Sequence, residues 1–219
     1  MWYPLAAMKG VLEALHQGDY DTAIDLLTRK ALFGREREAK EAWLLLAEVY
    51  ALYGEEGLEK AHHALEEAYA LGGLEYDPLY RSLLAELLAL EGRPEREVLP
   101  LFLPSRDPRV RYHQAQALFY LGRLEEALEV LEAGLPPHLA WRAEGLKGRI
   151  LERLGRHGEA ALAYERGAEL ALGLERYWLL LDAAAMGLEA GEGERALLAL
   201  KEAEAAVGEE DPEDAATRH

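Results

Sequence analysis

The sequence predicts an all-α protein, and three observations carry that prediction. Leu, Ala and Glu occupy 114 of the 219 positions, and all three are strong helix formers. The β-branched residues Ile, Val and Thr, which sheets favour, number only 11. Glycines stand at the ends of apolar helical stretches at nearly regular intervals. We therefore expect about six helical hairpins that follow one another along the chain.

The first helix of each expected hairpin ends at a glycine, because glycine adopts the left-handed cap conformation at little cost. The spacings between successive glycines are 36, 38, 30, 33 and 36 residues. In chain order these six glycines are Gly18, Gly54, Gly92, Gly122, Gly155 and Gly191. A hairpin of about 34 residues cannot bury its apolar face alone, so the hairpins are expected to stack.

A small residue in the first turn of the second helix lets the two helix axes approach closely. An Ala stands five residues after the glycine in the first, fourth, fifth and sixth hairpins, as Ala23, Ala127, Ala160 and Ala196. In the second hairpin the interval lengthens to Ala61, and in the third Glu97 stands at the Ala position.

The second hairpin resembles the tetratricopeptide repeat, whose first helix carries Trp, Leu, a small residue, Tyr and Gly, and whose second carries Ala, a large apolar residue and Ala. The matching residues are Trp43, Leu46, Ala47, Tyr50, Gly54, Ala61, Leu65 and Ala68. The resemblance extends over roughly residues 5–207 and implies a right-handed α-solenoid. We expect a single repeat array over residues 1–207, followed at 208–219 by an acidic tail or the start of a truncated further helix.

The third hairpin departs from the pattern, because it contains Pro94, Pro100, Pro104 and Pro108. A long helix cannot run through Pro100 and Pro104 without breaking. We expect a short helix there and an irregular loop over about residues 99–108.

Charge and composition exclude several classes of protein. The formal net charge of −17 disfavours binding to nucleic acid and to an anionic membrane surface. No stretch is long and apolar enough for a membrane span, and the N-terminus lacks the features of a signal peptide. We expect a cytoplasmic protein. The chain has no Cys and no Asn and is highly charged, a composition typical of thermophilic proteins.

No arrangement of residues typical of catalysis emerges from the sequence. Only Ser82 and Ser105 are serines, and neither lies in a nucleophile elbow. No phosphate-binding glycine loop and no zinc motif occurs. We therefore expect a protein that is not an enzyme, with no catalytic residue, no metal and no cofactor.

The resemblance implies that a partner peptide binds the concave surface, which the first helices line. Groove positions lie thirteen, ten, six, three and two residues before each hairpin glycine. The candidate partner-binding residues at these positions are Arg109, Tyr112, Gln116, Phe119, Arg142, Arg149, Arg153 and Trp178. The same count in the second and third hairpins includes Glu41, Glu48, Ser82 and Glu86.

A basic stripe stands out without the resemblance. Arg142, Arg149 and Arg153 lie at i, i+7 and i+11, on one face of a helix. Arginine binds carboxylates through paired hydrogen bonds, and neighbouring aromatics offer apolar anchors. The stripe favours an acidic or carboxylate-ended partner segment. The alternative, that these arginines pair with acids of the same chain, stays open.

The sequence thus predicts a non-catalytic scaffold that binds a segment of another protein. One alternative is an interaction or effector domain of a larger bacterial transcriptional or signalling regulator. The other is a self-assembly module in which the last helix, through Leu197, Leu200, Ala203 and Val207, forms a homodimer.

Overall fold

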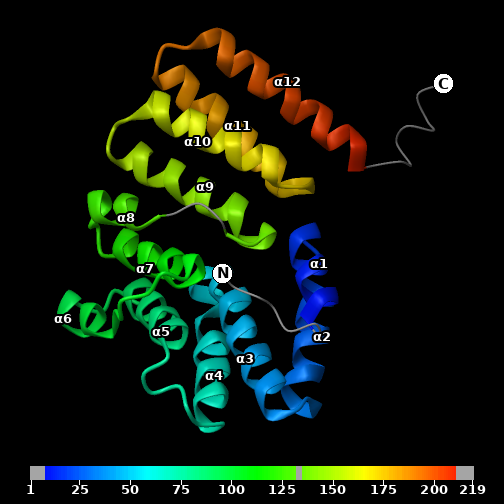
Figure 1. Ribbon diagram of the computed structural model, residues 1–219. Coiled ribbons are helices and arrows are strands. Elements are labelled where there is room, and N and C mark those ends of the chain that lie inside the picture. Colours follow the sequence, from blue (N-terminus) through cyan, green and yellow to red (C-terminus); the bar gives the residue numbers. More distant parts are fainter. Residues whose placement is uncertain (1–7, 132–134, 211–219) are drawn as a thin grey trace. The chain divides into compact units, whose positions relative to one another are not determined.

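Helices carry the architecture of the protein, and no strand forms among the described residues. The computed structural model describes residues 8–131 and 135–210, with backbone only for residues 208–210. The described residues fall into two compact units (Figure 1). Unit 1 draws on residues 1–15 and 19–135, and unit 2 on residues 16–18 and 136–219.

Unit 1 contains the first helix up to Leu15, the next seven helices and two 3-10 turns, at Gly54–Gly57 and Leu99–Leu101. Its helices are α1 (Lys9–Gln17), α2 (Tyr20–Phe33), α3 (Glu36–Ala51), α4 (Leu58–Ala70), α5 (Pro78–Leu90), α6 (Glu95–Val98), α7 (Pro108–Tyr120) and α8 (Leu124–Val130). Unit 2 contains α9 (Pro137–Arg153), α10 (His157–Leu170), α11 (Gly173–Glu189) and α12 (Gly193–Glu210). No helix among the described residues has the length and apolar content to cross a membrane.

The six hairpin glycines take the conformation that the sequence predicts. Their φ angles are all positive, between 58° and 78°. At Gly155, the glycine N–H donates to the Glu152 carbonyl at 2.9 Å, and the Arg156 N–H reaches back to the Leu151 carbonyl, also at 2.9 Å. These bonds satisfy carbonyls that the end of α9 would otherwise leave open.

The small residues after the glycines are buried where the two helices meet. Ala23, Ala61, Ala127, Ala160 and Ala196 are all at most 1% exposed. The third hairpin differs from the sequence expectation, because Val98 and not Glu97 takes this place.

In the third hairpin Val98 is fully buried, while Glu97 turns outward to pair with Arg93 at 2.7 Å. The shift by one residue follows from the start of α6 after Pro94.

The proline-rich stretch leaves unit 1 without a long second helix in its third hairpin. α6 is a single turn, and residues 102–107 have no helix before α7 begins. Arg81 donates to the carbonyls of Pro100 and Leu101, and Gln114 donates to that of Leu103. Because so little helix follows α5, α5 packs directly against α7.

In unit 2 the hairpins stack in chain order. α10 packs against both α9 and α11, and α11 packs against both α10 and α12 (Figure 1). α12 continues to Glu210, past the Val207 where the sequence reading ends it. The tail or further helix expected at its end falls mostly on residues 211–219, which lie outside the described residues. A single array over residues 1–207 stays a prediction.

Candidate functional site

In unit 1 the predicted groove residue Arg109 lies inside the protein. Its side chain is 0% exposed, on α7. Its Nε donates to Glu48 Oε2 at 2.9 Å, and its Nη1 donates to Glu41 Oε1, also at 2.9 Å. Both carboxylates lie on α3, so this arginine ties α7 to α3.

His113, one turn further along α7, extends the same network. Its Nδ1 lies 2.6 Å from Glu86 Oε2 on α5, and its Nε2 lies 3.1 Å from Glu48 Oε2. Burial lowers the pKa of His113, but the two carboxylates, Glu86 first, outweigh it and raise the pKa to about 9. The imidazole is therefore charged at neutral pH and donates from both nitrogens.

We call these residues, Glu41, Glu48, Glu86, Arg109 and His113, the polar cluster. Burial of carboxylates is costly unless cations and hydrogen bonds compensate for it, and here Arg109 and His113 supply both. Burial lowers the pKa of the Arg109 guanidinium, but the Glu48 and Glu41 carboxylates outweigh it and hold that pKa above its ordinary value. The cluster fixes the first helices α3, α5 and α7 against one another.

The other three predicted groove residues of unit 1 are also buried. Tyr112, Gln116 and Phe119 lie on α7, and Gln116 Nε2 donates to the Tyr112 hydroxyl at 2.9 Å. Together with Arg109 they offer no open surface in this structure. Partner contact at these four residues stays a prediction, and it would require them to be uncovered first.

In unit 2 the three predicted arginines of α9 have different surroundings. Arg142 is only 7% exposed, and its guanidinium lies 5.0 Å from the centre of the Trp141 ring. Arg149 and Arg153 are exposed. Of the three arginines, Arg142 is therefore buried, and Arg149 and Arg153 lie at the surface.

Trp178 lies on the neighbouring first helix, α11, and 59% of it is exposed. Trp178 stands thirteen residues before Gly191, the same interval that separates Arg142 from Gly155. The two helices touch at Gly145 of α9, where an added Cβ would lie 3.3 Å from the Leu179 side chain of α11.

Acidic groups lie beside the exposed arginines. Burial and the nearby Glu152 raise the pKa of Asp182, while Arg149 lowers it. Glu152 also accepts a hydrogen bond from the Tyr164 hydroxyl at 2.9 Å. Arg149 thus lies near Glu152 of its own helix and Asp182 of α11, which supports in part the alternative of pairing within the chain.

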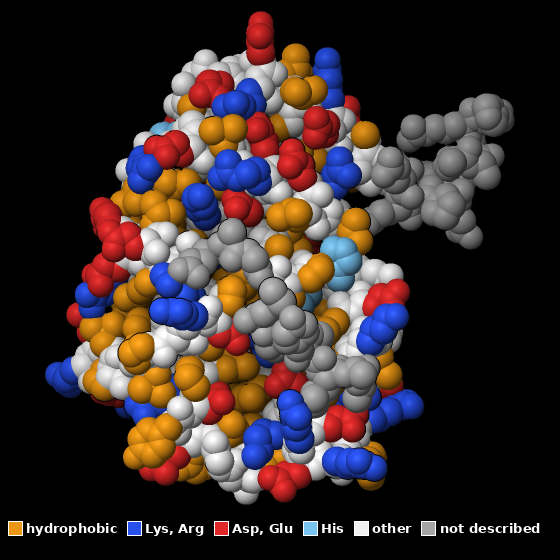
Figure 2. Space-filling view, in the orientation of Figure 1, with side chains coloured by type: hydrophobic (Ala, Val, Ile, Leu, Met, Phe, Trp, Pro, Cys, Tyr) orange, Lys and Arg blue, Asp and Glu red, His pale blue; other side chains and the backbone are white. Residues whose placement is uncertain are grey.

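We call Arg149, Arg153, Trp178 and Asp182 the α9–α11 face. It carries both signs of charge and an exposed aromatic ring. Figure 2 shows the same mixture more widely, with basic, acidic and hydrophobic side chains interleaved over the upper part of the view. Such a face suits a segment in which an acidic and an apolar side chain stand close together.

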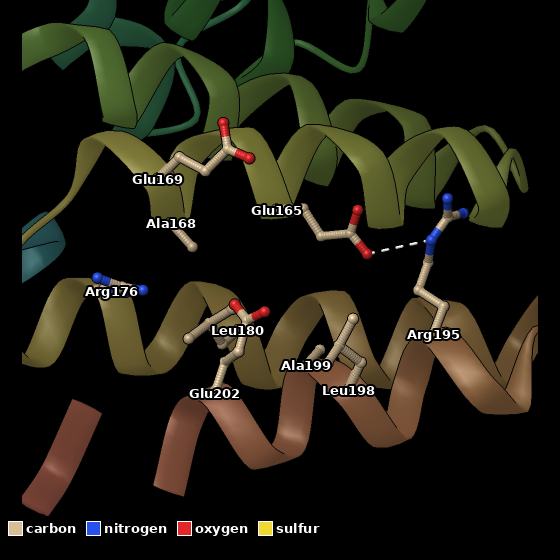
Figure 3. Close-up of a pocket in the computed structure, with 9 residues that line it drawn as sticks. All are labelled: Glu165, Ala168, Glu169, Arg176, Leu180, Arg195, Leu198, Ala199 and Glu202. Carbon is tan, nitrogen blue, oxygen red and sulfur yellow. Dashed lines mark ion pairs between the residues drawn. The ribbon is translucent and has the colours of Figure 1, made fainter. Parts of the chain in front are cut away.

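A hollow of about 360 Å³ lies between α10, α11 and α12, and nothing in the sequence reading anticipated it (Figure 3). Leu180 and Ala199 contribute apolar lining, and Glu169 and Glu202 contribute carboxylates. Arg195 pairs with Glu165 at 3.2 Å at one end (Figure 3). The hollow combines both charges with a small apolar area, so its lining selects no single class of ligand.

No group of three or more His, Cys, Asp or Glu residues that could hold a metal ion is found within residues 8–131 and 135–210.

The sequence analysis did not predict the polar cluster, although the sequence contains one pattern that indicates it. Glu48 and Glu86 both stand six residues before a hairpin glycine, so the groove count places them on the same layer of helices. His113 is not at a counted position, and its partners lie 27 and 65 residues away in the chain.

Comparison with known proteins agrees with the repeat structure. A family model described as tetratricopeptide repeat matches residues 9–55 and 112–173. These stretches contain four of the six hairpin glycines, Gly18, Gly54, Gly122 and Gly155. No curated protein and no solved structure matches the chain. With its glycine-ended helical hairpins and the family match in both units, the chain belongs to the tetratricopeptide repeat family.

Proposed function

We propose that this protein is a non-catalytic scaffold whose α9–α11 face binds a segment of another protein. Tetratricopeptide repeats generally mediate protein–protein interaction, and members of the family are typically not enzymes. The observation that carries the proposal is that Trp178 of α11 and Arg149 and Arg153 of α9 are all exposed. Tryptophan and arginine are the residues most enriched among those that dominate binding energy.

The proposed roles follow from the surroundings of each side chain. Trp178 supplies the apolar anchor, since more than half of its surface remains to be covered. Arg149 and Arg153 orient an acidic group of the partner, and Asp182 beside them limits how much negative charge the face accepts. Arg142 acts indirectly, because it is buried against Trp141.

The partner we propose is therefore a peptide segment with an acidic residue or carboxylate end next to a large apolar residue. The helices that present the face are held by their packing against α10. A preformed surface of this kind loses little conformational entropy on binding. With a net charge of −17, a nucleic acid partner remains disfavoured.

A selection from a random peptide display library tests this proposal. The immobilised full chain should enrich peptides that combine acidic and large apolar residues. The double variant Arg149→Glu, Arg153→Glu should lose that enrichment, because its face repels acidic segments.

Arg29→Glu with Arg37→Glu is the matched control, since it makes the same change of net charge at exposed positions on α2 and α3. If the Arg149 and Arg153 variant enriches the same peptides as the unchanged protein, the site does not lie on the α9–α11 face.

A further inference from the structure

The α11–α12 hairpin exposes an apolar surface. The equivalent surface of the preceding hairpin is buried. Positions six, nine and sixteen residues after the hairpin glycine are buried in the α9–α10 hairpin, where α11 follows. The same positions in the α11–α12 hairpin are 54%, 42% and 46% exposed. The buried set is Ala161, Tyr164 and Ala171, and the exposed set is Leu197, Leu200 and Val207.

The first helices show the same contrast. On α9, Gly145 lies against Leu179 of α11. Glu152 of α9 lies close enough to Asp182 of α11 for its charge to raise the pKa of that carboxyl. The equivalent residues on α11 are Leu181 and Leu188, which stand 36 residues later. The only described helix of unit 2 that follows them is α12, the second helix of the same hairpin, and Leu188 is 62% exposed.

We call Leu181, Leu188, Leu197, Leu200 and Val207 the end face. The register of the repeat shows that this face has the form that accepts another helix. An exposed apolar surface of this extent on two adjacent helices is unusual for a protein that acts alone.

The charged residues in the α12 part of the end face indicate which kind of helix binds there. Lys201 and Glu204 flank Leu200 and Val207 on this side of α12, and neither forms an ion pair with a described residue. A two-fold axis between Leu200 and Glu204 would set α12 antiparallel to α12 of a second copy. Leu197 then faces Val207 of the second copy, and Lys201 comes beside Glu204 of the second copy, twice by symmetry.

We propose that the end face joins two copies of this chain in a two-fold dimer. Residues 211–219, which lie outside the described residues, contain no Leu, Ile, Val, Met, Phe, Tyr or Trp. They cannot supply the apolar surface that a second copy supplies. Ala203, which the sequence reading placed in such an interface, is buried against α11 and takes no part.

Sedimentation equilibrium of the full chain over a range of concentrations tests the dimer. The unchanged protein should sediment as a dimer, and Leu200→Glu should sediment as a monomer. Leu198→Glu is the matched control, because Leu198 is an exposed leucine of the same helix that faces the hollow and not the end face. Circular dichroism shows whether each variant keeps its helices.

A charge exchange tests the antiparallel arrangement and avoids the apolar residues. Lys201→Glu and Glu204→Lys should each weaken the dimer roughly ten-fold, since each sets like charges opposite one another. An equal mixture of the two single variants should restore the dimer as a mixed species, because the charges then match on both sides.

A monomeric unchanged protein would overturn the proposal, and the face would then await a further repeat or another protein. A dimer that survives Leu200→Glu would also overturn it, since the contact would lie elsewhere. Failure of the mixture to restore the dimer would refute the antiparallel arrangement. None of these variants alters the α9–α11 face, so the outcome is separate from that of the peptide selection.

Discussion

The polar cluster of unit 1 shows how single residues allow charges to be buried. Glu48, Glu86 and His113 are each less than 5% exposed, and Arg109 is fully buried. Removing one partner of such a network leaves an uncompensated buried charge, which is strongly destabilising. The charge state of His113 should therefore control the stability of the cluster.

We predict that the protein loses stability as the pH rises through about 9. The folded-state pKa of His113 is raised to about 9, from an ordinary value of 6.5, because its charged form bonds to Glu86 and Glu48. Below pH 6.5 both states hold the proton and the stabilisation is complete. Above it the unfolded state binds fewer protons than the folded state, so the free energy of unfolding falls with pH until His113 deprotonates. Urea unfolding between pH 6 and about 9.5 measures this fall, expected to be on the order of a few kcal/mol.

The double variant His113→Gln, Glu86→Gln provides the comparison, because it replaces the charged pair by amides. Its free energy of unfolding should change much less over the same pH window. A variant that shows the full pH dependence of the unchanged protein would assign the effect to other groups.

Gly148 shows how closely α9 and α10 approach in unit 2. A Cβ there would lie 2.6 Å from Tyr164 Cε1, and the Tyr164 hydroxyl is fixed by Glu152. We predict that Gly148→Ala lowers the free energy of unfolding by about 1–3 kcal/mol through overpacking, although Ala normally favours helix. Gly193→Ala, where a Cβ meets open space, should leave stability unchanged or slightly higher. Thermal unfolding that finds Gly148→Ala as stable as the unchanged chain would contradict the packing argument.

At the scale of elements, the short α6 has the largest consequence for unit 1. Since it does not separate α5 from α7, these helices pack directly, and Glu86 reaches His113. The irregular backbone after α6 is held by side chains of its neighbours. Arg81 reaches the Pro100 carbonyl at 2.9 Å, and Gln114 reaches the Leu103 carbonyl at 3.0 Å.

We predict that Arg81→Met increases hydrogen exchange in residues 100–106, because two carbonyl acceptors lose their donor. Exchange in α9 to α12 should not change. Arg29→Met is the control, since its ion pair with Asp25 is largely exposed. Unchanged protection of residues 100–106 in Arg81→Met would show that other contacts hold the segment.

The elements that the sequence predicts well are those that depend on local rules. A glycine with positive φ and a small residue five positions later need no knowledge of distant contacts, and both recur along the chain. The site could be predicted less completely. The helical spacing groups Arg142 with Arg149 and Arg153, but it does not show that Arg142 lies against Trp141. His113 depends on helices far away in sequence, so no local pattern marks it.

At the scale of the whole molecule, the two units are built from the same repeat, but their first helices differ in what they bury and expose. In unit 1 the first helices meet in a buried network of charges, while in unit 2 they present charges and a tryptophan at the surface. This division places the proposed contact with another protein on unit 2. It leaves unit 1 as the part whose stability depends on pH.

The most direct test of the proposed function is a calorimetric titration of the full chain with a peptide from the selection. Trp178→Ala should bind at least roughly ten-fold more weakly than the unchanged protein, because the anchor of the α9–α11 face is lost. Phe33→Ala, which removes a more exposed aromatic side chain from unit 1, should bind with unchanged affinity. Equal affinity of Trp178→Ala and the unchanged protein would contradict the account, since the partner would then bind without the residue on which the proposed site depends.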